Sequence, residues 1–194
     1  NKSPGEFKTE QNYIGNSAEI TFTPLPPELT QDYMANFEQY IHFDEVDLLV
    51  QAALIHCQFE MIHPFKDGNG RIGRLLIPLF LYYREMLPVP TFYMSAYFEK
   101  DRTMYLEKLS AVSQKNDYAT WIKYFLEGVI QQAEINTLKA KALLERYNEF
   151  KDICISGMSS KYAIPLLDEI FQRPAFKAKQ IQEVIPGSKG TLYN

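Results

Sequence analysis

Most of the chain alternates apolar and polar residues at spacings of three and four, the pattern of helices that bury one face. These spacings predict helices at about residues 29–41, 44–62, 70–86, 101–114 and 118–150. Pro26 or Pro27 can open the first helix, and Asp44 is a suitable N-cap for the second. Pro64 requires the second helix to end near Ile62, because a proline disfavours helical geometry at the residue before it.

Residues 7–23 have a different pattern, in which β-branched and aromatic residues flank Gly15, Asn16 and Ser17. This combination predicts a short hairpin with a turn in its middle, and its expected role is that of a flap. Pro24 stops the second strand. The predicted fold class is therefore mostly α, with one small β-hairpin.

The helical pattern loosens after Phe150, which marks a candidate domain boundary. We predict a core over residues 1–150 and a helical segment over residues 151–194. The segment holds two short helical patterns and a turn into an incomplete third element, at residues 161–171, 175–185 and 186–188.

Composition places the chain among folded globular proteins, since 46% of its 194 residues are hydrophobic and 23% are charged. A net charge of −4 argues against a surface that binds nucleic acid throughout, and leaves a local basic site open. Cys57 and Cys154 lie far apart, so we expect no disulfide framework. No apolar run is long enough for a membrane span, and residues 1–10 lack the apolar stretch of a signal peptide. We expect a cytoplasmic protein and, because the sequence opens with Asn1, an excised fragment.

The most informative segment runs from His63 to Arg74, between two predicted helices. Gly68 and Gly70 allow the backbone to turn with positive φ, and they expose successive N–H groups at a helix N-terminus, where anions bind. Arg71 lies three residues before Arg74, so both guanidinium groups can face one polyphosphate. The segment predicts a phosphate site, and two arginines suit a triphosphate.

Three side chains of the same segment suggest chemistry beside the phosphates. Asp67 offers the hard carboxylate that Mg²⁺ accepts as one ligand among phosphate oxygens and waters. His63 can act as a base near neutral pH. Asn69 either holds the loop or contacts a phosphate, and spacing alone leaves both open.

Two other interpretations weigh against this one. The three glycines of the segment also fit the dinucleotide fingerprint, but that motif needs a preceding strand, and here a helix and Pro64 precede it. His56, Glu60 and His63 share one helical face and could form a metal trio, although Pro64 turns His63 away from that helix.

Taken together, residues 63–74 resemble the signature of the Fic family, His-Pro-Phe-x-Asp/Glu-Gly-Asn-Gly-Arg-x-x-Arg, with every fixed position present. The resemblance extends over about residues 5–150. It includes a flap strand, a Pro-rich connection, the helix before the motif and two later helices, at residues 5–15, 23–27, 52–60, 101–109 and 121–126.

The resemblance implies a Fic-type helical bundle that transfers AMP from ATP to a Ser, Thr or Tyr hydroxyl of a protein and releases pyrophosphate. It implies that His63 deprotonates the target hydroxyl and that Asp67 holds Mg²⁺ between the α- and β-phosphates. The residues implied to bind ATP are Gly68, Asn69, Gly70, Arg71, Arg74, Ile14, Gly15, Asn16, Ser17 and Tyr105. Among them Arg71 would support the β-phosphate and Arg74 the γ-phosphate, while the flap would also pin a target segment by strand addition.

Some positions depart from the family pattern. Relatives with an inhibitory helix carry Ser/Thr-x-x-x-Glu-Gly/Asn, and here residues 95–99 and 103–107 have the spacing but are followed by lysine. The motif could lie upstream of this sequence. Tyr105 and Leu106 stand where relatives often pair aromatics against adenine, which leaves the preferred base open. Lys8 stands where relatives usually have arginine.

Residues 161–194 resemble the opening of a winged-helix unit, whose complete form could bind DNA or a protein; two packed helices with solvated lysines are the competing interpretation. For the core, two alternatives stay open beside AMP transfer. One is removal of AMP from a modified protein by the same site, and the other is a transcription-regulator-like module that senses nucleotide.

Overall fold

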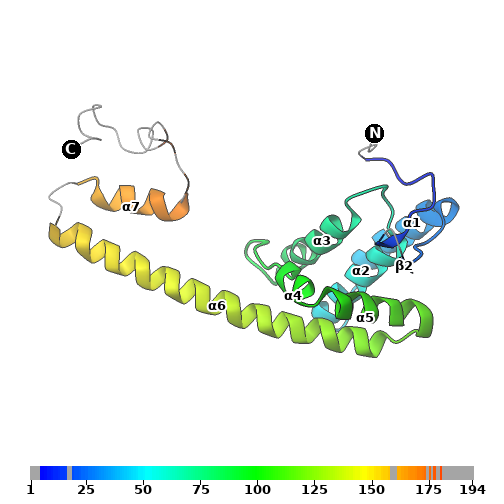
Figure 1. The fold of residues 1–194 in the computed structure, drawn as a ribbon. Coiled ribbons are helices and arrows are strands. Elements are labelled where there is room, and N and C mark those ends of the chain that lie inside the picture. The colour runs from blue at the N-terminus through cyan, green and yellow to red at the C-terminus, as the bar shows by residue number, and fades with distance from the viewer. Residues whose placement is uncertain are drawn as a thin grey trace. The chain divides into compact units, whose positions relative to one another are not determined.

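A computed structural model describes residues 5–16, 19–157, 161–173, 175, 177 and 180, and it is mostly helical (Figure 1). The elements follow the chain in the order β1 (Ile14–Asn16), β2 (Glu19–Phe22), η1 (Pro27–Leu29), α1 (Thr30–Ile41), α2 (Leu48–Ile62), α3 (Asn69–Tyr83), α4 (Ser95–Lys100), α5 (Arg102–Lys115), α6 (Tyr118–Gly157) and α7 (Ala163–Gln172). The chain divides into two compact units, Asn1–Glu134 and Ile135–Asn194. The predicted domain boundary after Phe150 stays a prediction.

Helix α2 is buried on nearly all sides and packs against α1, α3 and α5. Its N-cap is Asp47, whose Oδ1 accepts hydrogen bonds from the N–H groups of Leu49 and Val50 at 2.8 and 3.1 Å. The prediction of Asp44 as the cap was therefore wrong. Asp44 instead accepts a hydrogen bond from Arg84 at 2.9 Å, so its carboxylate is used in a contact with the end of α3.

An aromatic cluster joins α2 to the helices that follow the motif. Trp121 is fully buried, and its indole N–H donates to the carbonyl of Ala53 at 2.8 Å. The rings packed around it are His56, Phe98, Tyr105, Tyr124 and Phe125. Because these rings come from α2, α4, α5 and α6, the cluster fixes α5 beside the residues of α2 that lead into the motif.

Gly128 of α6 packs directly against Tyr97 of α4 and against Met94, the N-cap residue of α4. A Cβ there would overlap the ring of Tyr97 and lie 2.7 Å from Cε of Met94. We expect Gly128→Ala to lower the free energy of unfolding, because overpacking costs about 1–3 kcal/mol and outweighs the roughly 1 kcal/mol gained in helix propensity. Gly157→Ala is the matched control, since a Cβ at Gly157 meets nothing within 4 Å. Urea unfolding of both variants measures the difference, and an equally stable Gly128→Ala protein would contradict this packing.

Two elements differ from the sequence pattern. Helix α4 was not predicted, because six residues are too few to show a helical period. Helix α6 continues to Gly157, beyond the predicted end at residue 150, so the loosening of the apolar pattern reflects a solvated helix surface and not a break in the helix.

The two strands pair antiparallel, with Ile14 opposite Phe22 and Gly15 opposite Ile20, and an irregularity in register between Ile14 and Gly15. They are shorter than the predicted hairpin over residues 7–23. Ser17, predicted at its turn, lies outside the described residues. The hairpin's function as a flap stays a prediction.

In the second unit, α7 corresponds to the helix predicted at residues 161–171. The hydroxyl of Tyr147 donates to Asp168 at 2.6 Å, and the rings of Tyr147 and Phe150 contact Phe171. The rest of the winged-helix prediction, at residues 175–185 and 186–188, falls mostly or wholly outside the described residues. Within the described ranges, no helix has both the length and the apolar character needed to cross a membrane.

Candidate active site

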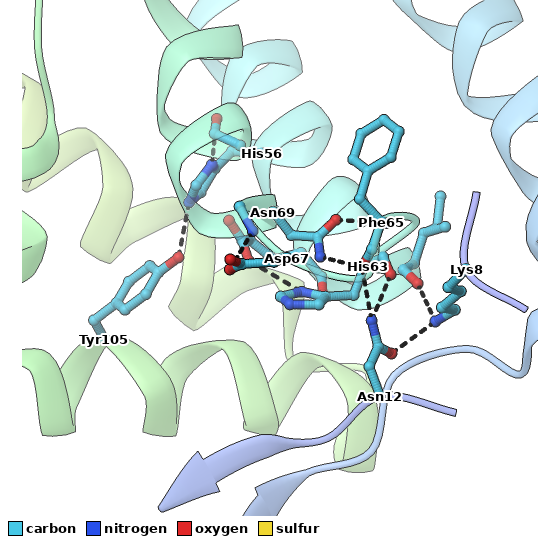
Figure 2. Close-up of polar contacts among 12 residues, drawn as sticks. Lys8, Asn12, His56, His63, Phe65, Asp67, Asn69 and Tyr105 are labelled. Atoms are coloured by element: carbon cyan, nitrogen blue, oxygen red, sulfur yellow. Dashed lines mark hydrogen bonds and ion pairs between the residues drawn. The ribbon is translucent and has the colours of Figure 1, made fainter. Parts of the chain in front are cut away.

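The glycine-rich segment forms a tight loop between α2 and α3 (Figure 2). His63 ends α2 in the left-handed conformation, with φ of 50°, and Gly68 begins α3 with φ of 85°. Few non-glycine residues adopt positive φ, and those that do gather at active sites and at the C-terminal ends of helices. The predicted positive φ is confirmed at Gly68 but was wrong for Gly70, which lies in the first turn of α3 with helical geometry. The left-handed conformation of His63 was not predicted.

Lys8 fastens the N-terminal segment to this loop. Its backbone N–H donates to the carbonyl of Pro64 at 2.8 Å, and its ammonium donates to the carbonyl of Ile62 and to Oδ1 of Asn12, each at 3.0 Å. The side chain is almost completely buried, and this burial lowers its pKa from 10.5 to about 8.

The lowered pKa of Lys8 makes stability depend on pH. Between about pH 8 and 10.5 the unfolded chain holds this proton and the folded chain does not, so the contribution of Lys8 to stability rises with pH in that window. A neutral amine still donates two hydrogen bonds, so the contacts survive. In Lys8→Arg the guanidinium stays charged and the rise disappears. Urea unfolding of both proteins at several pH values measures it; a difference in stability that does not change with pH would contradict the burial of Lys8.

Two asparagines hold the loop closed. The side chain of Asn69 is buried, and its Oδ1 accepts from the N–H of Phe65 at 2.8 Å while its Nδ2 donates to the carbonyl of the same residue at 2.6 Å. Asn12 donates to the carbonyls of His63 and Phe65 at 3.0 and 3.1 Å (Figure 2). Of the two roles left open for the Asn69 amide, the structure therefore supports holding the loop.

His63 is partly exposed, and its Nδ1 faces Glu60. That nitrogen lies 3.3 Å from the carbonyl oxygen of Glu60 and 3.5 Å from its carboxylate oxygen Oε2. Both partners are acceptors, so Nδ1 carries the hydrogen and Nε2 is the basic nitrogen.

His56, the other histidine of α2, serves the core. Its Nδ1 lies 2.9 Å from the carbonyl of Gly73, and its Nε2 lies 3.0 Å from the hydroxyl of Tyr105. Complete burial lowers its pKa, so the ring is neutral, donates to the carbonyl and accepts from the tyrosine. With both nitrogens in use, the metal trio of His56, Glu60 and His63 is excluded. No set of three or more His, Cys, Asp or Glu in the described ranges could hold a metal.

The loop opens into a cavity of about 490 Å³. The predicted site residues that line it are Ile14, His63, Asp67, Gly68, Asn69, Gly70, Arg71, Arg74 and Tyr105. Of the other predicted residues, Gly15 and Asn16 follow Ile14 in β1, and Ser17 lies outside the described part of the chain. Lining residues that the sequence analysis did not assign are Asn12, Tyr13, Glu60, Lys66, Glu99, Arg102, Leu106 and Leu109.

Charges of both signs line this cavity, with the cations in excess of the three carboxylates of Glu60, Asp67 and Glu99. Four cationic side chains line it, Lys66, Arg71, Arg74 and Arg102. The N-terminus of α3 adds its partial positive charge.

Glu99 restrains Arg74 only weakly. Its Oε1 lies 3.7 Å from Nη1 of Arg74, and more than half of the Glu99 side chain is exposed. Exposed ion pairs of this kind contribute about 0–1 kcal/mol, so an incoming phosphate can displace the glutamate. The Ser95–Glu99 spacing noted in the sequence thus places a carboxylate beside the second arginine of the motif.

The motif and its helical surroundings define a class. Residues 1–81 match the model of the Fic/DOC family, and they contain His63 and the whole phosphate loop. This part of the chain is therefore similar to the Fic/DOC family, in agreement with the sequence resemblance.

Curated relatives are named protein adenylyltransferases. The fic-1 protein of Caenorhabditis briggsae is 33% identical over 88 residues, which are 44% of this chain and 16% of that protein. A probable protein adenylyltransferase of Aquifex aeolicus is 32% identical over 106 residues, covering 51% of this chain and 33% of that protein. The chain thus spans a third or less of the length of these relatives.

Solved structures of Fic proteins share the helical fold. A Fic family protein from Desulfovibrio desulfuricans G20 matches 97% of this chain and 53% of its own, with a TM-score of 0.62 at 17% identity. A Fic domain containing signaling protein from Bacteroides thetaiotaomicron matches 66% of this chain and 52% of its own, with a TM-score of 0.52 at 26% identity.

Proposed function

We propose that this chain transfers AMP from ATP to a hydroxyl group of a protein and releases pyrophosphate. One observation carries the proposal: a single cavity holds His63, with Nε2 as its basic nitrogen, beside a glycine-bounded helix N-terminus and two arginines. The names of the relatives support the same activity.

The first step is binding of the triphosphate at the start of α3. Helical N–H groups at an N-terminus lack partners within the helix, and Gly68 and Gly70 leave the approach to them clear of side chains. Arg71 would support the β-phosphate and Arg74 the γ-phosphate, with Glu99 released as the phosphate arrives. The Asn69 amide would act indirectly, by keeping the loop closed.

Asp67 is the residue that would hold Mg²⁺. Its carboxylate is exposed at the cavity, and its Oδ1 accepts from the N–H of Gly68 at 2.7 Å, which fixes its direction. One carboxylate beside phosphates suits Mg²⁺, which takes its other ligands from phosphate oxygens and water. The ion would neutralise charge on the departing pyrophosphate.

The chemical step then needs one base. The target hydroxyl oxygen attacks the α-phosphorus, its proton passes to Nε2 of His63, and the bond between the α-phosphorus and the bridging oxygen to the β-phosphate breaks. The flap formed by β1 and β2 would hold the target segment by main-chain hydrogen bonds, which give register with little side-chain selectivity.

Two further expectations stay predictions. One is a cytoplasmic location, and the other is binding of DNA or protein by a complete C-terminal unit.

Transfer of label from ATP tests this function. With Mg²⁺, we expect the chain or an added protein to retain label from ATP labelled at the α-phosphate and none from ATP labelled at the γ-phosphate. Retention of the γ-label would mean phosphoryl transfer instead. If protein retains neither label while AMP or ADP accumulates in solution, the chain hydrolyses ATP, which would also contradict the proposal.

A further inference from the structure

Glu60 is a buried carboxylate at the wall of the candidate active site. It lies on α2 one turn before His63, lines the cavity, and is 5% exposed. Its Oε2 faces Nδ1 of His63 at 3.5 Å, whereas its Oε1 has no hydrogen-bond partner in the described part of the chain. Burying a charged group without full pairing is costly, so such a group in a native structure calls for an explanation.

Gly73 provides the space for this carboxylate. A Cβ at Gly73 would overlap Oε1 of Glu60 and lie 3.1 Å from its Cδ and from a ring carbon of Phe59. Any larger residue at this point of α3 would push the carboxylate from its place beside His63. Two helices, α2 and α3, thus form the space that the Glu60 carboxylate occupies.

Phosphate binding does not explain the carboxylate. A negative charge in the cavity repels a triphosphate, and the groups suited to bind one are the cationic side chains and the N-terminus of α3. Among the described ion pairs, the Glu60 carboxylate contacts one side chain of the cavity, that of His63.

We propose that Glu60 is a positioning residue for His63, an inference that rests on the proposed function. The Nδ1–H of His63 donates to the backbone carbonyl of Glu60 at 3.3 Å and faces the Glu60 carboxylate at 3.5 Å, which orients the ring and, in its neutral form, leaves Nε2 as the nitrogen without hydrogen. When Nε2 takes the proton of the target hydroxyl, the ring becomes positive while Nδ1 keeps its hydrogen. The adjacent negative charge stabilises that cation, as in other carboxylate–histidine pairs.

Glu60→Gln tests the charge with little change of shape. We expect the maximal rate of single-turnover AMP labelling to fall roughly ten- to hundredfold, and the Kd for ATP to stay the same or decrease, because a repulsive charge has gone. A merely structural role predicts a different split, in which ATP binding weakens together with the rate. That result, or an unchanged rate, would overturn the proposal.

Glu169→Gln is the matched control. Glu169 is also buried, at 7% exposed, and its Oε1 makes no hydrogen bond but lies 3.5 Å from Nη1 of Arg173. It belongs to α7, in the second unit. We expect its substitution to leave both the rate and the Kd for ATP unchanged.

A double-mutant cycle tests whether Gly73 leaves the space for the Glu60 carboxylate. Gly73→Ala should lower the labelling rate by displacing the carboxylate, so adding it to Glu60→Ala should cost little more. If the two fold-reductions in labelling rate simply multiply, Gly73 acts independently of Glu60, and its proposed part in placing the carboxylate is wrong.

A measurement on the free protein separates this inference from the proposed function. The ¹⁵N chemical shifts of the His63 ring, at a pH where it is neutral, report which nitrogen carries hydrogen. We expect the Nδ1–H tautomer in the unsubstituted protein and a partial shift of population toward Nε2–H in Glu60→Ala, which leaves only the backbone carbonyl of the two acceptors that face Nδ1. If the chain fails to transfer AMP but this shift occurs, the proposed function fails and the positioning contact stands; an unchanged tautomer population overturns the positioning contact.

Discussion

Replacing His63 with alanine is expected to slow AMP transfer about 10²- to 10⁴-fold, the usual contribution of a general base, while ATP binding persists. The reason is that the imidazole accepts the proton of the target hydroxyl, whereas the phosphates are held by the start of α3 and its arginines. Single-turnover labelling measures the rate, and calorimetric titration with ATP and Mg²⁺ measures the affinity.

His42→Ala is the control for this experiment. His42 is exposed and contacts Tyr83 at 3.0 Å through Nδ1, and it does not line the cavity. We expect its loss to leave the rate unchanged. Labelling that continues at the original rate in His63→Ala would remove His63 as the base.

Replacing Arg74 with alanine is expected to have the opposite profile, in which ATP binding weakens most. A charge-assisted contact to phosphate contributes about 1.5–3 kcal/mol, so the Kd for ATP should rise about 10- to 150-fold. In the unsubstituted protein ATP must displace Glu99 from Arg74, and the alanine variant avoids this cost. The saving does not offset the lost phosphate contact, because the exposed Arg74–Glu99 pair contributes about 1 kcal/mol or less. Titration with ATP measures the change, and AMP should bind with nearly the original affinity because it lacks a γ-phosphate.

Arg84→Ala is the matched control for the arginine. Arg84 binds Asp44 and the carbonyl of Phe43 at the other end of α3, so removing it should not affect nucleotide binding. An unchanged Kd for ATP in Arg74→Ala would mean that the γ-phosphate binds elsewhere.

Local sequence signals predicted most of the helical core, because helix periodicity and proline positions act over a few residues. The errors arose where neighbouring signals competed. Asp44 and Asp47 both suit an N-cap, and only the contact of Asp44 with Arg84, some 40 positions away, decides between them. A helix as short as α4 leaves no periodic pattern to detect.

The candidate site likewise contains residues that local sequence signals predicted and residues that they did not. The loop residues could be predicted because nine fixed positions stand in one short segment. The contacts of Lys8, Asn12 and Glu99 could not be predicted, since each reaches the loop or its arginine from a distant part of the chain. Glu60 was visible one helical turn before His63, but its spacing suggested a metal trio, and only the bonds of His56 to Gly73 and Tyr105 exclude that interpretation.

The central claim is that the start of α3 binds the phosphates of ATP within reach of His63. The most direct test is a crystal structure of the chain with Mg²⁺ and an ATP analogue that cannot be cleaved between its α- and β-phosphates. We expect the β- and γ-phosphates against Gly68, Gly70 and the two arginines of the motif, and the α-phosphate facing Nε2 of His63. Phosphates bound away from this loop, or a His63 ring turned from the α-phosphate, would contradict the account.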